Sequence, residues 1–317
     1  MAITLEQAKA LLTDEISQSV IEEFRKSSYL MENMVFDDAV YPAGNGGALT
    51  YSYYRLTALP SADFRSINSN FTSQTISKTK YTVDLKAFGG SFNIDRVLAK
   101  SSIIDEVAFQ SKQMIKQTIA LFNDTIINGD TSEDTDAFDG LEKALDGSST
   151  EFNGGDSDTA IDISAANIDT NYKKFLDMLD EFILGLDGTP SVLMGNTTLI
   201  AKIRACARRT GNIFETLDDF GRQIVTYGGI PLIDMGNKSG STNPVIATTA
   251  GETNLYAARL GLDAFHGICM RDSSPIRIWL PDFETAGAVK QGEVEMVAAV
   301  ALKDTKTAGV FRQIKVQ

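Results

Sequence analysis

The chain of 317 residues carries a net charge of −13, with 29 Lys and Arg against 42 Asp and Glu. This acidic balance argues against tight nonspecific binding to nucleic acid, because neutralising phosphates needs clustered cations. A hydrophobic share of 43% and a charged share of 22% are typical of a folded protein with one large or two ordinary domains. The sequence begins without a secretory signal and has no apolar run of membrane-spanning length, so we expect a cytoplasmic protein.

The first 48 residues have the pattern of a detached arm. Apolar residues recur at helical spacing from Leu5 to Phe24, and Met31 and Met34 continue the apolar run until a glycine-rich break at residues 41–47. Such an arm buries its apolar side chains either against its own body or against a neighbouring subunit. The second alternative makes Phe24, Met31 and Met34 candidate assembly contacts.

Residues 49–88 are predicted to form an extended β-hairpin. The first strand, 48–57, is rich in Tyr and Thr, and the second alternates apolar and polar residues from Tyr81 until Gly89 and Gly90, where it is expected to end. The mostly polar connection, 58–79, is too long for a loop inside a compact domain. Since a two-stranded ribbon is marginal alone in water, we expect it to reach toward a partner. Its candidate assembly residues are Phe64, Phe71, Lys78 and Lys80.

The most regular stretch is a long predicted helix, Ser102–Asn128, with Ser102 as the expected N-cap. One apolar stripe runs along it at three- and four-residue steps: Ile104, Val107, Ala108, Ile115, Ile119, Phe122 and Ile126. Asn128 and Gly129 supply a stop that tolerates the left-handed conformation. A helix of this length, about 40 Å at 1.5 Å per residue, needs an extended surface to lie against.

The remainder alternates helices with short strands, so the predicted fold class is α+β. An acidic, glycine-rich surface loop is expected at residues 151–162, and helices are expected at 168–186 and 197–209. Short strands are expected at 191–194, on both sides of the Gly228–Gly229 turn, at 245–249 and at 255–260. Strands 294–302 and 310–316, joined by a turn, are expected to pair with one another.

No motif for catalysis, a cofactor or a metal is complete, so we predict that the chain is not an enzyme. A phosphate-binding G-x-x-x-x-G-K-[ST] sequence is absent. Four oxygen-bearing residues stand at alternate positions, Asp130, Ser132, Asp134 and Asp136. However, Thr135 and Leu141 occupy the places where a calcium loop needs Gly and Glu.

The remaining reactive or charged residues have structural interpretations. The only histidine, His266, lies in an apolar run and is predicted to be a packed structural residue. Cys206 and Cys269 are expected to be buried free thiols of a reducing compartment. The nearest approach to a basic cluster is expected to be the solvated face of a helix, with Lys202, Arg204, Arg208 and Arg209.

Three short motifs stand in order along the chain. Residues 91–101 read Ser-Phe-Asn-Ile-Asp-Arg-Val-Leu-Ala-Lys-Ser. Residues 126–130 read Ile-Ile-Asn-Gly-Asp and are followed by Phe-Asp-Gly-Leu at 138–141, and residues 227–233 read Tyr-Gly-Gly-Ile-Pro-Leu-Ile. In this order they resemble the entry to the spine helix, the end of that helix and a later strand turn in the major capsid protein family of tailed bacteriophages, whose fold encapsulin shells share. The resemblance covers nearly the whole chain.

The resemblance implies a phage major capsid fold with five parts: an N-terminal arm (1–48), an extended loop (49–88), a peripheral domain with the spine helix 102–128 (89–163), an axial domain (164–283) and C-terminal strands that return to the peripheral domain (284–317). It further implies self-assembly into the pentamers and hexamers of an icosahedral shell around double-stranded DNA, with the arm and the extended loop on neighbouring subunits.

The partners implied are other copies of the chain, separate scaffolding and portal proteins, and packaged DNA without tight specific binding. No cofactor and no membrane are implied, and the location is the virion capsid after assembly in the host cytoplasm. Two alternatives stay open: an encapsulin-type compartment loaded with a cargo enzyme, and a soluble enzyme that uses residues 164–283.

Overall fold

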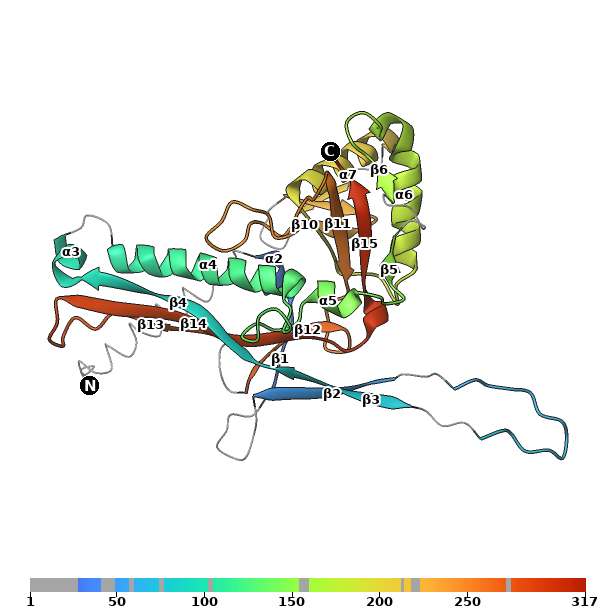
Figure 1. Cartoon of the computed structure of the whole chain (residues 1–317), viewed down its shortest axis with the longest axis horizontal. Coiled ribbons are helices and arrows are strands. Elements are labelled where there is room, and N and C mark those ends of the chain that lie inside the picture. The colour runs from blue at the N-terminus through green and yellow to red at the C-terminus, as the bar shows by residue number, and fades with distance from the viewer. Residues whose placement is uncertain are drawn as a thin grey trace.

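The computed structural model describes residues 28–40, 49–56, 60–73, 77–101, 105–153, 160–211, 214–217, 223–271 and 275–317. Figure 1 shows a long helix lying along a sheet, a lobe of sheet and helices rising at the C-terminal end of that helix, and a hairpin projecting from under the body. This mixture of helices and strands confirms the α+β fold class. Within the described ranges, no helix combines the length and apolar character needed to cross a membrane.

The first sheet is built around the long strand β14 (Val289–Leu302), and we call it the β14 sheet. Its antiparallel partners are β4 (Lys86–Asp95), β12 (Phe265–Met270) and β13 (Ile276–Trp279), and β1 (Phe36–Val40) runs parallel to β12 at the edge. The predicted strand end at Gly89 and Gly90 is wrong, because β4 continues through both. A Cβ on Gly89 would lie 2.0 Å from the Val294 carbonyl oxygen, so close approach to β14 requires this glycine.

Helix α4 (Glu106–Asn128) covers one face of the β14 sheet (Figure 1). Ile115, Ile119, Phe122 and Ile126 are all buried on that side. The Phe122 ring stacks on Phe88 of β4, with the ring centroids 5.9 Å apart. The C-terminal part of the predicted apolar stripe is therefore confirmed as the face that joins the helix to the sheet.

The start of α4 differs from the prediction. Asp105 is the N-cap in place of Ser102, and its carboxylate accepts a hydrogen bond of 3.1 Å from the backbone N–H of Ala108. Ala108, which was expected in the apolar stripe, is exposed. Residues 102–104 lie outside the described residues, and a separate short helix, α3 (Arg96–Ser101), precedes them. With 23 residues, α4 is about 35 Å long.

The end of α4 is closed by the segment that follows it. The backbone N–H of Gly140 donates to the carbonyl of Gly129 (2.8 Å), immediately before α5 (Leu141–Leu145) enters the core. Gly129 has φ −61° and ψ 133°, so it is extended, and the expected left-handed stop is wrong. A Cβ on Gly129 would lie 2.1 Å from the Phe138 carbonyl oxygen. Glycine is needed here because the 138–141 segment passes against the helix end.

Gly129→Ala is expected to lower the free energy of unfolding by about 3 kcal/mol, because the new methyl group overlaps two backbone carbonyl oxygens. Gly185→Ala is the matched control, at the end of α6 (Ile168–Leu184). There φ is −72° and the nearest atom to a new Cβ is 3.3 Å away. We expect the control to change stability by less than about 0.5 kcal/mol in urea unfolding. Equal losses in the two variants would contradict the close approach at Gly129.

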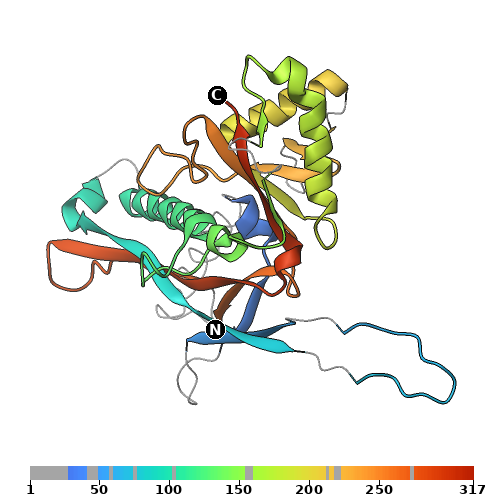
Figure 2. The same ribbon diagram turned by 45° about the vertical axis from the view of Figure 1, so that its right-hand side comes forward.

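The second sheet contains β15 (Ala308–Lys315), and we call it the β15 sheet. Its strands in spatial order are β5 (Glu151–Phe152), β15, β11 (Glu252–Ala258), β7 (Val192–Gly195), β10 (Ile230–Asp234), β9 (Gln223–Tyr227) and β8 (Phe214–Leu217), and β6 (Ile161–Asp162) also pairs with β15. Helices α6 and α7 (Thr197–Thr210) cover one face through buried residues such as Phe175, Leu179 and Ile203 (Figure 2). The opposite face shares its core with α4 and β14.

Most elements predicted for this lobe are confirmed. Both helices form, and so do the strand at 191–194 and the two strands around Gly228 and Gly229, which have φ of 56° and 84°. The predicted strand at 245–249 is wrong, although Val245 and Ile246 are buried. The expected loop at 151–162 contains β5 and β6 in its described part.

The predicted pairing of the last two strands is wrong. β14 and β15 lie in different sheets and are joined through a 3-10 helix, Thr305–Thr307. Residues 284–317 are therefore divided between the two sheets and do not return together to one domain. Similarly, β12 and β13 were assigned to the 164–283 domain but lie in the β14 sheet. Alternation of apolar residues identifies a strand, but it is the same for any pairing partner.

Candidate assembly surfaces

The hairpin is formed by β2 (Thr50–Leu56) and β3 (Lys78–Asp84), as predicted. Tyr53 pairs with Tyr81 across the two strands, and their rings stack with centroids 5.9 Å apart. The Arg55 guanidinium lies 4.2 Å from the centroid of the Tyr81 ring. These cross-strand contacts stiffen a ribbon that has few apolar side chains of its own.

The root of the hairpin is held on the outer face of the β14 sheet, opposite α4. Val40, Tyr53, Leu85, Ile268 and Ala301 form a small buried cluster there, separate from the two larger cores. Polar bonds add to this attachment: Arg55 Nε donates to the Leu302 carbonyl (3.1 Å), and the Tyr51 hydroxyl donates to Asp37 (2.8 Å). The hairpin is thus fixed at one end only.

The tip of the hairpin exposes apolar side chains. Phe64, Ile67 and Phe71 have relative exposures of 106%, 91% and 64%, and every residue from 60 to 73 is exposed. Arg65 organises the tip, since its Nη1 donates to the Ser69 carbonyl (3.1 Å) and its guanidinium lies 5.4 Å from the Phe71 ring centroid. Three large exposed apolar side chains within eight residues make the tip a candidate interaction surface. We call Phe64, Ile67 and Phe71 the tip cluster.

The hairpin also differs from the rest of the chain in charge. Residues 49–88 contain five Lys and Arg against two Asp, a net charge of +3 in a chain of −13. Lys78 and Lys80 are exposed on β3, where they were predicted as assembly residues. A cationic ribbon on an acidic body is complementary in charge to a second copy of the same chain.

The arm residues predicted as assembly contacts lie elsewhere. Met31 and Met34 are 4% and 5% exposed in the chain's own core, next to α4, which corrects their assignment to a neighbouring subunit. Met31 lies within α2 (Tyr29–Asn33) and Met34 is its C-cap, and β1 then joins the edge of the β14 sheet. Phe24 lies outside the described residues. For the described part of the arm, the alternative of packing on its own body is the one observed.

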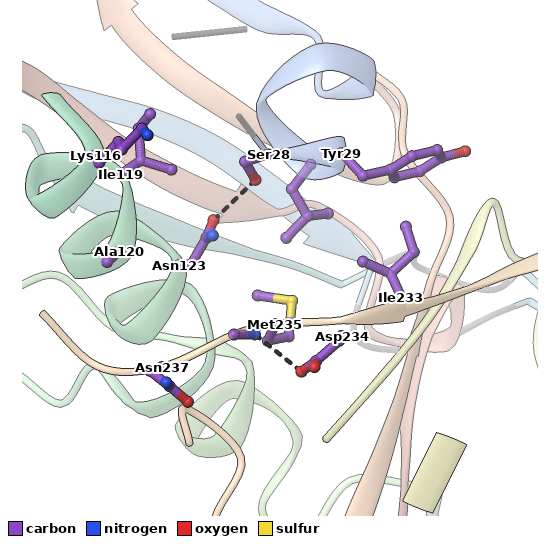
Figure 3. Close-up of a pocket in the computed structure, with 12 residues that line it drawn as sticks. Ser28, Tyr29, Lys116, Ile119, Ala120, Asn123, Ile233, Asp234, Met235 and Asn237 are labelled. Carbon is purple, nitrogen blue, oxygen red and sulfur yellow. Dashed lines mark hydrogen bonds between the residues drawn. The ribbon is translucent and has the colours of Figure 1, made fainter. Parts of the chain in front are cut away.

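A pocket of about 600 Å³ lies between α2, α4 and the segment that follows β10 (Figure 3). Ser28 Oγ donates to Asn123 Oδ1 across it (3.3 Å). Its carboxylate, Asp234, already accepts hydrogen bonds from Thr197 Oγ1 and from the backbone N–H of Gly236 (3.0 Å). The pocket therefore presents one carboxylate that two hydrogen bonds hold in place and one exposed amine, Lys116.

Carboxylates that come together in the fold are neutralised by cations of the chain itself. Lys143 Nζ lies 2.6 Å from Asp130 and 2.9 Å from Asp139, so an ammonium group pairs with the first carboxylate of the stretch considered above for calcium. The hydrogen bond from Lys143 holds the pKa of Asp130 at about 2. Similarly, Arg312 of β15 pairs with both Glu142 and Glu151.

The predicted structural roles of the histidine and the thiols are confirmed. His266 is completely buried in β12, and Cys206 and Cys269 are buried free cysteines. Burial raises the pKa of the Cys206 thiol to about 11, so it is an inert, protonated thiol at neutral pH.

No protein-family model and no curated protein matches this sequence. Solved structures match it over most of its length. The holo-SrpI encapsulin complex from Synechococcus elongatus aligns at 14% identity with a TM-score of 0.62, over 91% of this chain and 88% of that chain. The capsid of the Myoviridae phage XM1 aligns at 14% identity with a TM-score of 0.53, over 90% of each chain. The capsid of a native GTA particle aligns at 11% identity with a TM-score of 0.56, over 91% of this chain and 90% of that chain.

The chain has the fold of these shell proteins. We call it the shell fold, and it is the fold expected from the three sequence motifs.

A second group of exposed apolar side chains lies at the end of the β14 sheet that is far from the lobe containing α6 and α7. Val97 and Leu98 of α3, Phe109 of α4 and Val289 of β14 are 48–65% exposed.

Sequence reasoning missed this second surface and also Ile67 of the tip cluster. Val97 and Leu98 stand inside the 91–101 motif, where an apolar pair preceding a helix gave no sign of exposure. Ile67 was detectable, because it is an isolated β-branched residue within a polar stretch.

Proposed function

We propose that this chain is the subunit of a self-assembling protein shell. The observation that carries the proposal is the tip cluster: three exposed apolar side chains on a hairpin whose described contacts with the body lie at its root. Exposure of these side chains to water does not stabilise an isolated subunit, whereas their burial against a neighbouring subunit would stabilise the contact between the two. The likeness of the whole chain to shell proteins supports the same conclusion.

Within this proposal, the chain is a major capsid protein of a tailed bacteriophage. The three sequence motifs support this, and so does the likeness to the XM1 capsid. The hairpin is the extended loop that lies over a neighbouring subunit, α4 is the spine helix of the peripheral domain, and the lobe with α6 and α7 is the axial domain. Pentamers and hexamers of the chain enclose double-stranded DNA, and scaffolding and portal proteins are separate partners.

A second candidate is the shell of an encapsulin-type compartment that holds a cargo protein. The alignment with the Synechococcus encapsulin complex, with its TM-score of 0.62, favours it. The two candidates differ in what the shell encloses. Particles isolated from the native source would carry nuclease-protected DNA in the first case and a co-purifying enzyme in the second.

Electron microscopy of the purified full-length chain tests the shell. We expect closed particles or rings of five and six subunits, and sedimentation far above that of a 34.4 kDa monomer. A monomer at all concentrations and ionic strengths, without particles on addition of any scaffolding protein from the same source, would contradict the proposal. Turnover of a substrate by that monomer would instead support the soluble enzyme.

A further inference from the structure

His266 lies under the root of the hairpin and is 0% exposed. Its Nδ1 lies 3.4 Å from the Ala264 carbonyl oxygen, so the ring proton is on Nδ1 and donates to that carbonyl. The other ring nitrogen, Nε2, is buried and has no hydrogen-bond partner among the described residues. The site therefore fits a neutral imidazole and offers nothing to a second ring proton.

The ring is in direct contact with the hairpin. Tyr51 of β2 meets it edge to face, with centroids 5.9 Å apart and an interplanar angle of 78°. The same Tyr51 donates its hydroxyl proton to Asp37 of β1, at 2.8 Å. His266 is thus part of the surface of the β14 sheet against which β2, the first strand of the hairpin, packs.

The charged groups around His266 and Tyr51 form ion pairs with one another or with neighbouring residues. Lys303, which follows β14, lies 4.0 Å from Asp37 and 5.5 Å from the centroid of the Tyr51 ring. Asp263, in the turn before β12, pairs with Arg259 at 2.9 Å. Asp37 and Asp263 each have a partner, and Lys303 is a cation on the same side of the sheet. Asp37 and Asp263 favour an imidazolium through their charge, but neither accepts a hydrogen bond from the ring, and burial and Lys303 outweigh them in setting the pKa of His266.

We propose that His266 is a pH-sensitive lock, that is, a residue whose protonation state controls attachment of the hairpin. The neutral ring packs against Tyr51 and holds β2 on the β14 sheet, and protonation in mild acid releases Tyr51 and β2 from the sheet. Protonation places a buried positive charge and an unpaired N–H donor against an aromatic ring edge and near Lys303, and release of the hairpin root admits water to both. The small cluster that holds the root is separate from the main cores, so this release leaves the body folded.

The direction of the pH dependence follows from the histidine. Burial, and secondarily Lys303, hold the pKa of His266 below its ordinary value of about 6.5. A released ring therefore binds a proton at a higher pH than a buried ring does. The attached state of the hairpin keeps its full stability above about pH 6.5 and loses stability as the pH falls below that value. The ratio of attached to released hairpin falls by up to tenfold for each pH unit, until the pH reaches the lowered pKa of the buried ring.

Hydrogen–deuterium exchange of the full-length chain tests the lock. Because His266 is the only histidine, exchange of its ring C–H, measured by mass spectrometry, gives its titration curve without ambiguity. We expect a midpoint below 6.5, and a loss of about tenfold in amide protection of residues 50–56 and 78–84 between pH 7.5 and pH 5, after correction for intrinsic exchange. Amides of α6 and β11 serve as internal controls and are expected to keep their protection.

His266→Gln supplies the matched variant, since the amide side chain stays neutral at both pH values. We expect its hairpin amides to keep the same protection at pH 5 as at pH 7.5. A ring midpoint at or above 6.5, no loss of protection in the native chain, or an equal loss in His266→Gln would each overturn the proposal. If the variant does not fold, the ring midpoint and the amide protection of the native chain decide it. Both readouts are taken on unassembled subunits, so their outcome does not depend on whether the chain forms shells.

Discussion

Replacing Phe64, Ile67 and Phe71 together with serine is expected to abolish shell assembly and to leave the subunit folded. These side chains contribute nothing to the subunit's cores, since they are 106%, 91% and 64% exposed. If a neighbouring subunit buries them, each contributes about 1.5–3 kcal/mol to that contact. Losing about 5 kcal/mol per contact weakens each subunit pairing by more than a thousandfold, and the loss is repeated at every contact of a closed shell.

Sedimentation velocity and negative-stain microscopy measure the assembly, and thermal unfolding of the subunit measures the fold. The matched control changes three other exposed positions of the same tip, Ala62→Ser, Asn70→Ser and Thr72→Ser. The control is expected to assemble as the native chain does. Particles of normal size and stability from the Phe64, Ile67 and Phe71 variant would show that the tip cluster does not join subunits.

Ile119→Asp is expected to prevent folding altogether. Ile119 is 4% exposed and belongs to the buried cluster that α4 shares with the β14 sheet, together with Phe122 and Met296. Lys116 lines the same pocket as Ile119, but its side chain is exposed, so pairing with it would not remove the cost of a carboxylate in the buried cluster. Burying it costs about 4 kcal/mol or more in addition to the lost apolar contacts, which is a large part of the 5–15 kcal/mol that typically stabilises a domain.

The control for this prediction is Gln113→Asp, on the exposed side of the same helix. It introduces the same side chain with the same low helix propensity, and we expect it to change the free energy of unfolding by less than about 0.7 kcal/mol. Circular dichroism and soluble yield report the outcome. A soluble Ile119→Asp subunit with a native spectrum would mean that the assigned apolar face is not the one that packs on the sheet.

The elements that follow from local pattern were predictable from the sequence. Period-two alternation identified β3, helical spacing identified α6 and α7, and Gly211, with φ of 79°, ends α7 as a left-handed glycine does. The hairpin was predictable because its long polar connection does not suit a compact interior. These signals depend on neighbours within about ten residues.

Features set by distant residues were not predictable. Both Ser102 and Asp105 suit an N-cap, and the local sequence does not choose between them; α4 begins after Asp105. Glycine is required at position 129 because the Phe138 carbonyl oxygen lies against it, and the residues next to Gly129 in the sequence do not show this contact. For Met31 and Met34, an apolar run shows that burial is needed but not which surface provides it, and the chain's own core does so.

The exposed surface proposed for assembly was predictable in part. Phe64, Phe71, Lys78 and Lys80 are exposed on the hairpin, where the sequence placed them, because a polar stretch with isolated aromatics has no core to enter. The root contacts of Tyr51, Arg55 and His266 depend on strands more than 200 residues apart, and only the folded sheet brings them together.

The attachment of the hairpin by its root alone makes it a lever arm. Tyr51, Tyr53 and Arg55 hold most of the paired part of β2 on the body, so the lever is the part of the hairpin beyond Leu56, where residues 60–73 are all exposed. In the proposed capsid of pentamers and hexamers, one sequence would have to join neighbours at more than one angle. A small tilt at the root would give the tip that range of positions, while the two larger cores keep a single shape.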